Sequence, residues 1–358
     1  MKSPGDGRLF FLDGLRGWGA LVVLLAHIFG EGFPINDQVT AVLTRMGFFN
    51  AGLAVWIFFV VSGFSLSIGF CRHRNPTILT VISLGRYARL AIPILGAALL
   101  LYLFFVLGLV PEPEHRLPKF HTFLTTSPTL WGVVRFSLFD VFFAYDSATT
   151  LIGPLWTMPF ELWGSALVLG TLFVAGRIER RGWLYAVLGL VGYLVNPIYT
   201  ALIVGLVLAE VHASGILAAR QDADSPVYLL IFLTGVLLAG PLPIIGNHPG
   251  AQLLVATMLT TASVFGQPIS SFLSGGLSRF LGRISFPLYL IHGPLFLAYG
   301  NNAYGWIDGP TDLQKLLLNL SIVAVCIGFA TLLAPMDQFG IAVAKRFSGY
   351  IVSRGGAP

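Results

Sequence analysis

Two side chains that could do acid–base or anion chemistry lie in the first apolar segment of the chain. Arg16 and His27 are separated by ten residues, all of them apolar or glycine. Charged and titratable side chains are costly at membrane depth, so they tend to face a protein interior and to take part in chemistry or transport. A histidine near a helix end can instead reach the membrane surface, and His27 taken alone is open to both interpretations.

A carboxylate, Glu161, lies in a later apolar segment. If the N-terminus is cytoplasmic, the helical rise places His27 roughly 16 Å further from the cytoplasm than Arg16, in the outer half of the membrane. Glu161 also falls in the outer half. A carboxylate at the depth of an imidazole can fix its tautomer and raise its basicity. We therefore predict that Glu161 orients His27 as a general base. The alternative is a structural carboxylate that accepts hydrogen bonds from Trp156 or Trp163.

Four other residues with polar side chains lie in or beside apolar runs. Arg86 and Arg89 are spaced to share one helix face, which suits phosphate recognition, although anchoring at the cytoplasmic surface is the simpler interpretation. Ser62, followed by glycine, is more typical of close helix packing than of a nucleophile. His292 precedes Gly-Pro, which suggests a helix break that lines a cavity; the histidine could contact a ligand there or serve packing.

The composition of the chain indicates which class of protein carries these residues. The chain has 358 residues, of which 56% are hydrophobic and only 10% charged. Soluble domains carry about 25% charged residues, so the chain is predicted to be a polytopic membrane protein. Its net charge of +5 then reflects cytoplasmic loops and indicates no nucleic-acid partner. Cys71 and Cys326 fall in different environments, and neither shows metal-ligand spacing.

The predicted fold is an all-α bundle of about ten transmembrane helices. A cytoplasmic N-terminus places 16 of the 21 basic residues inside, which favours an even number of spans and both termini in the cytoplasm. Residues 1–345 form the predicted membrane domain, and residues 346–358 form a short basic cytoplasmic tail. The predicted helices fall near residues 12–30, 50–70, 91–110, 152–176, 183–197, 199–216, 226–245, 251–267, 284–300 and 316–338.

Residues 111–151 form one long outer segment. The stretch from Trp131 to Tyr145 is apolar and aromatic, so it could be an interfacial or re-entrant helix over the bundle. A plain connector with an aromatic belt is the alternative, although loops of this length are often functional.

Four sequence blocks together resemble the membrane-bound acyltransferase 3 family. They run from residue 12 to 294 and comprise residues 12–17 with His27, residues 54–64, residues 86–93 and residues 281–294. The resemblance implies an integral-membrane enzyme that moves an acyl group, often acetyl, from cytoplasmic acyl-CoA to a hydroxyl. By the same resemblance, His27 matches the proposed catalytic histidine and Arg16 its paired arginine, and Arg86 and Arg89 match the pair linked to the CoA phosphates.

The chain departs from the commonest bacterial pattern of that family at one segment. Residues 155–163 read LWTMPFELW, with one glutamate where LWSLxVEE is frequent. This segment looks more like a branch with fungal and metabolite-modifying members, which weakens the case for a polysaccharide acceptor.

The sequence therefore predicts a multi-pass O-acyltransferase of the plasma (inner) membrane, active in cell-envelope O-acetylation. Its partners would be acyl-CoA as co-substrate, an acceptor that is a glycan, lipid or small metabolite, and membrane lipids, with no tightly bound cofactor or metal. A proton-coupled transporter or flippase is the alternative, but an inward arginine pair is needless for proton coupling and no repeat is evident. We assign catalysis to His27, Glu161 and Arg16, acyl-CoA binding to Arg86 and Arg89, and substrate binding to Asp13, Ser62, Trp156 and His292.

Overall fold

The computed structural model describes residues 9–46, 49–176, 178–215, 226–240 and 248–355. Every regular element in these ranges is a helix, which confirms the all-α membrane bundle. Seven helices are long and apolar enough to cross a membrane, and a bent helix pair makes an eighth if it counts as one span.

The described part of each of the ten predicted segments is mainly helical, and residues 216 and 241–245 of two segments lie outside the described residues. Two of them, α8 and α10, have only 14 residues, fewer than a straight crossing of the hydrocarbon core needs. The ninety-degree bend between α11 and α12 follows Phe265. The ten segments are α1 (Phe10–Leu25) with a π-helical end (Ala26–Gly32), α3 (Ala51–His73), α4 (Pro76–Val106), α7 (Met158–Ala175), α8 (Gly182–Val195), α9 (Pro197–Ser214), α10 (Pro226–Ala239), α11 (Pro249–Phe265) with α12 (Gln267–Leu273), α13 (Gly276–Leu295) and α15 (Asp312–Gly355).

Several predicted helix boundaries were wrong because charged residues lie inside helices. The helix expected at 91–110 begins at Pro76, where Asn75 accepts a hydrogen bond from the Thr77 amide and proline occupies the first turn. Arg86 and Arg89 therefore lie well inside α4 rather than at its start. Likewise, α15 continues to Gly355, so most of the predicted tail is helix and residues 356–358 lie outside the described residues.

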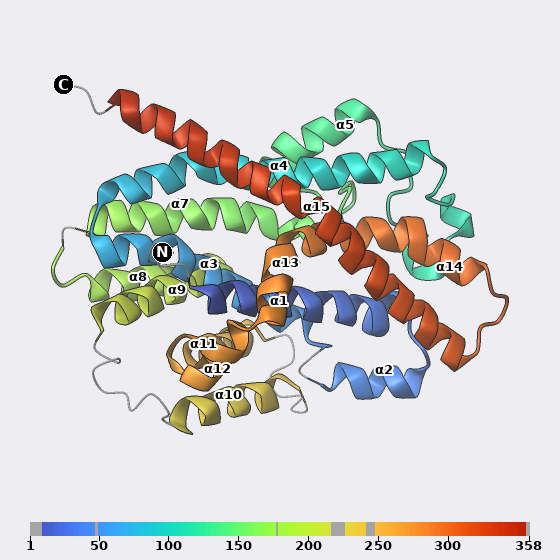
Figure 1. Ribbon diagram of the computed structural model, residues 1–358, viewed down its shortest axis with the longest axis horizontal. Helices are drawn as coiled ribbons and strands as arrows, with labels where there is room; N and C mark the ends of the chain where they lie inside the picture. Colours follow the sequence, from blue (N-terminus) through green and yellow to red (C-terminus); the bar gives the residue numbers. More distant parts are fainter. Residues whose placement is uncertain (1–8, 47–48, 177, 216–225, 241–247, 356–358) are drawn as a thin grey trace, which may run out of the picture.

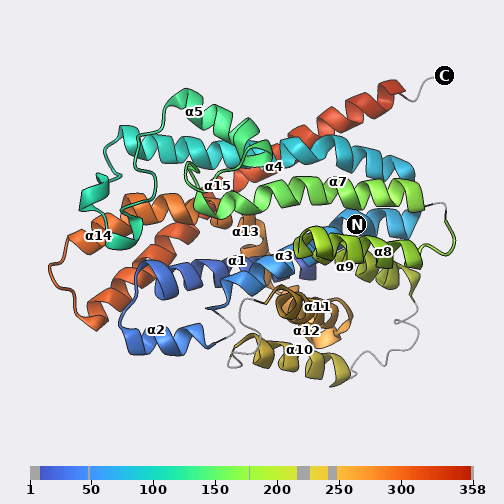
Figure 2. The ribbon, with the colours of Figure 1, turned by 180° about the vertical axis from the view of Figure 1, so that it is seen from behind.

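The arrangement of the helices places α1 and α13 near the centre of the bundle (Figure 1). α15 ends on the side of the bundle on which α1 begins, and α10, α11 and α12 form a group at one edge, as Figure 2 also shows from behind. α1 packs on α13, α3 on α9 and α4 on α15. At the α1–α13 crossing, a Cβ on Gly17 would meet the Gly282 backbone and a Cβ on Gly282 would meet the Asp13 backbone.

The outer segment contains a helix that overlaps the predicted stretch. It is formed by α5 (Leu130–Arg135), a π-helical turn (Phe136–Asp140) and α6 (Val141–Phe143). Phe136 and Phe142 are buried, and α5 packs on α4, whereas Trp131 and Phe139 are exposed. This amphipathic pattern suits a helix that lies on the bundle at the membrane surface.

Candidate active site

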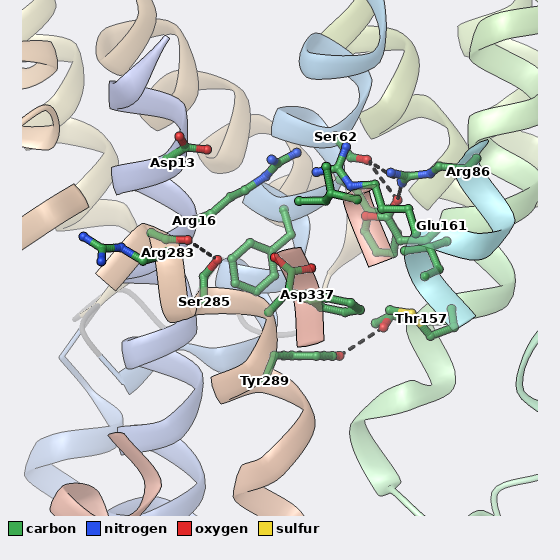
Figure 3. Close-up of a pocket in the computed structure, with 18 of the residues that line it drawn as sticks. Asp13, Arg16, Ser62, Arg86, Thr157, Glu161, Arg283, Ser285, Tyr289 and Asp337 are labelled. Carbon is green, nitrogen blue, oxygen red and sulfur yellow. Dashed lines mark hydrogen bonds and ion pairs between the residues drawn. The ribbon is translucent and has the colours of Figure 1, made fainter. Parts of the chain in front are cut away.

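A cavity of about 180 Å³ brings together charged side chains from five helices (Figure 3). We call it the basic cavity, because four arginines and three carboxylates line it. Arg16 and Asp337 point into the same space as Glu161 in Figure 3. Its charged residues are Asp13 and Arg16 on α1, Arg86 and Arg89 on α4, Glu161 on α7, Arg283 on α13 and Asp337 on α15.

Arg86 and Glu161 form a largely buried ion pair at the wall of the basic cavity. Arg86 Nη2 lies 2.5 Å from Glu161 Oε2, and the two side chains are only 11% and 15% exposed. Ser62 donates to the same carboxylate oxygen at 2.9 Å, and Arg86 Nε donates to Ser165 Oγ at 2.8 Å. These contacts satisfy both charges, as buried ion pairs require.

The expected contact between Glu161 and His27 was therefore wrong. α7 follows a 3₁₀ turn (Gly153–Thr157) whose Trp156 lines the cavity around His27, and Glu161 lies more than one helical turn beyond it. At that position the carboxylate meets Arg86 instead. Since a carboxylate in a low-dielectric interior needs a counter-charge, the pairing with Arg86 explains why Glu161 is tolerated there.

His27 lines a second cavity of about 440 Å³, which we call the histidine cavity. Its Nδ1 lies 3.2 Å from Glu31 Oε2, and its ring stacks on that of His292 with the centroids 5.4 Å apart. His292 is 2% exposed, and its Nδ1 lies 3.1 Å from the Leu288 carbonyl oxygen, to which it must donate. In the neutral form of His292, the Nε2 atom is then the unprotonated ring nitrogen.

π-Helical turns position the two histidines and Glu31. α1 passes into π-helical turns at Ala26–Gly32, which carry both His27 and Glu31, and α13 passes into π-helical turns at Phe296–Gly300, just after His292. π-Helical turns are rare and occur frequently at functional sites.

Tyr289 and Val55 line both cavities, so the two adjoin each other. The Tyr289 hydroxyl donates to the Pro154 carbonyl oxygen at 2.6 Å and lies 3.0 Å from Thr157 Oγ1. These bonds fix the tyrosine ring between the basic cavity and the histidine cavity.

The structure divides the predicted site residues between the two cavities. Asp13, Arg16, Ser62, Arg86, Arg89 and Glu161 line the basic cavity, and His27, Trp156 and His292 line the histidine cavity. Sequence reasoning missed Glu31, although its position four residues after His27 is the spacing of helical side-chain pairs. It also missed Lys119, Arg283, Tyr289 and Asp337, of which Asp337 could have been noticed as a carboxylate within an apolar helix.

The chain is similar to known acyltransferases over nearly its whole length. The family model described as an acyltransferase domain, that of acyltransferase 3, matches residues 9–336. The O-acetyltransferase PaAT-1 of Phomopsis amygdali is 25% identical over 399 residues, which cover 90% of this chain and 80% of that protein. No solved structure matches the chain.

Proposed function

The chain belongs to the membrane-bound acyltransferase 3 family, and on that premise we propose that it transfers an acyl group from acyl-CoA to an acceptor hydroxyl, with His27 as general base. The single observation that carries this proposal is the geometry of His27: a cavity-lining imidazole with a carboxylate at Nδ1, beside a second cavity rich in arginine.

The contact with Glu31 supports the role of His27. An Nδ1–H that donates to Glu31 leaves Nε2 free to accept the proton of an acceptor hydroxyl. The hydroxyl oxygen then attacks the thioester carbonyl, the C–S bond breaks, and the protonated imidazole returns its proton to the departing CoA sulfur. Glu31 takes the orienting role that we had expected of Glu161.

The basic cavity supports an acyl-CoA donor. Arg16, Arg89 and Arg283 line it, and in the described part of the chain no hydrogen bond or ion pair engages the Arg89 or Arg283 guanidinium. Guanidinium groups bind phosphate with paired hydrogen bonds. Arg86 is instead held by Glu161, so we assign it to the cavity wall and Arg89 and Arg283 to the CoA phosphates.

The test measures acyl-CoA-dependent release of free CoA thiol by the purified protein in lipid nanodiscs. We expect His27→Ala to lower turnover at least about 100-fold, the usual contribution of a general base, with an unchanged melting temperature. His73→Ala, which removes an exposed imidazole at the end of α3, is the matched control and should leave turnover unchanged. Retained turnover in His27→Ala would overturn the assignment.

A second variant, Glu31→Gln, separates orientation from chemistry. The amide can still accept from Nδ1–H but no longer stabilises the imidazolium, so turnover should fall less than in His27→Ala. If wild-type protein turns over no thioester with any acceptor, the transporter alternative is favoured instead.

A further inference from the structure

We propose that the acceptor is a compact lipophilic alcohol, bound in the histidine cavity with its hydroxyl at His27 and its carbon skeleton against a wall of phenylalanines. The proposal rests on the proposed function and adds the substrate class.

The ionisable groups of the histidine cavity are gathered in one cluster. His27 stacks on His292 and contacts Glu31, and Glu31 Oε2 lies 4.0 Å from Lys119 Nζ. The Tyr289 hydroxyl already donates its hydrogen bond to the Pro154 carbonyl. Polar recognition is therefore concentrated at one place, which suits an acceptor with a single hydroxyl to be activated.

Apart from the indole N–H of Trp156, the other lining side chains are apolar. They are aromatic or aliphatic and come from α1, α3, the outer segment and the π-helical turns after α13: Val23, Ala51, Val55, Phe120, Phe123, Phe296 and Leu297. A sugar in this cavity would place several hydroxyls against groups that cannot hydrogen-bond, at a cost of roughly 1–3 kcal/mol for each. A hydrocarbon skeleton would instead gain from burial.

The volume of the cavity sets the size of the acceptor. About 440 Å³ lies within the range of small-molecule sites, which bury most of a ligand of drug size. A compact skeleton fits within this space, whereas two long acyl chains would extend beyond it.

The phenylalanine wall consists of Phe120, Phe123 and Phe296, and hydrogen bonds of the outer segment hold the backbone around the first two. Arg116, only 5% exposed, donates to the carbonyl oxygens of Pro111 at 2.7 Å, Phe123 at 2.5 Å and Leu124 at 3.2 Å. The segment is joined to the bundle by the Leu117 amide, which donates to Asn301 Oδ1 at 2.8 Å. A wall fixed in this way favours one acceptor shape, so the outer segment determines specificity.

The experiment compares acceptors with radiolabelled acetyl-CoA and the full-length protein in nanodiscs. The probes are borneol as a compact lipophilic alcohol, glucose and cellobiose as sugars, and a long-chain diacylglycerol. We expect kcat/KM for borneol to exceed that for each other probe at least about tenfold, because the others leave polar groups unpaired or do not fit. Preference for a sugar or for the diacylglycerol would overturn the proposal.

Variants of the phenylalanine wall test whether the histidine cavity selects the acceptor. Phe123→Ala should lower kcat/KM for borneol about tenfold, mainly through KM, because buried aromatic contact is lost. Phe123→Leu should retain most of it, and Phe139→Ala, at an exposed phenylalanine on the interfacial helix, should change nothing. An unchanged KM in Phe123→Ala, at an unaltered melting temperature, would contradict the assigned cavity.

The outcomes distinguish the two proposals. If thioester is hydrolysed in a His27-dependent manner but borneol is not acylated, only the acceptor class fails. If no thioester is consumed with any probe, the proposed function fails as well.

Discussion

Arg86 and Glu161 neutralise each other inside the bundle, and two serines complete the network. Ser62 donates to the carboxylate, and Ser165 accepts from the guanidinium. The network joins α3, α4 and α7 at the wall of the basic cavity. We therefore propose that its residues hold the cavity in shape rather than act on the acyl group.

The loss of one partner of this ion pair should destabilise the protein more than the loss of both. Glu161→Met leaves Arg86 as an uncompensated buried charge and should destabilise the protein by about 3 kcal/mol. The double variant Arg86→Met/Glu161→Met should recover much of that loss, because an apolar pair of similar volume needs no charge compensation. Thermal unfolding of the two variants and the wild type in one detergent measures the difference. A double variant that is less stable than the single one would contradict the pairing.

The types of the site residues could be predicted from the sequence, but not their partners. His27 and Arg16 were identified because such side chains are unusual in an apolar run. The partner of His27 was missed because only residues of different helices at one depth were compared, although Glu31 follows His27 at the spacing of helical side-chain pairs. π-Helical turns carry both His27 and Glu31, and a 3₁₀ turn leads into α7 ahead of Glu161.

At the scale of elements, the close crossing of α1 and α13 positions the site. Gly17 lies against the backbone of Gly282, which brings Asp13 and Arg16 beside Arg283 in the basic cavity. Small residues at such crossings let membrane helices approach closely.

We predict that Gly17→Ala separates these helices. Its Cβ would stand 2.4 Å from the Gly282 nitrogen, so the backbones must move, at a typical cost of about 1–3 kcal/mol. Gly170→Ala on α7, where nothing lies within 4 Å of the added Cβ, is the matched control and should be neutral or slightly stabilising. Melting temperatures of the two variants check this. Equal stability would mean that the crossing is looser than described.

Apolar periodicity predicted the existence of the helices better than their ends. All ten segments were found, yet α4 starts fifteen residues earlier than expected, at Pro76 rather than 91. A hydropathy criterion stops at charged residues, whereas Arg86 is accommodated inside α4 by Glu161 from another helix. Such compensation comes from tertiary contacts, which the sequence alone does not display.

Across the whole molecule, the basic cavity and the histidine cavity lie at different positions along α1, so the proposed donor and acceptor sites face different ends of the bundle. α1 begins on the side of the bundle on which α15 ends, and along the chain Arg16 precedes His27, which lies in the π-helical continuation of α1. If the ends of the chain are cytoplasmic, acyl-CoA meets the basic cavity first and the acceptor hydroxyl is activated nearer the outer surface. The proposed donor route therefore depends on the orientation of the protein.

Cysteine labelling in intact cells tests that orientation. Both native thiols, Cys71 and Cys326, are buried, so the wild type should react little with a membrane-impermeant maleimide and serves as the control. Thr126→Cys, at an exposed position of the outer segment, should be labelled in intact cells. Ser353→Cys, exposed near the end of α15, should be labelled only after the membrane is permeabilised. The reverse pattern would put the basic cavity on the side away from cytoplasmic acyl-CoA, and the arginines could then not receive the donor as proposed.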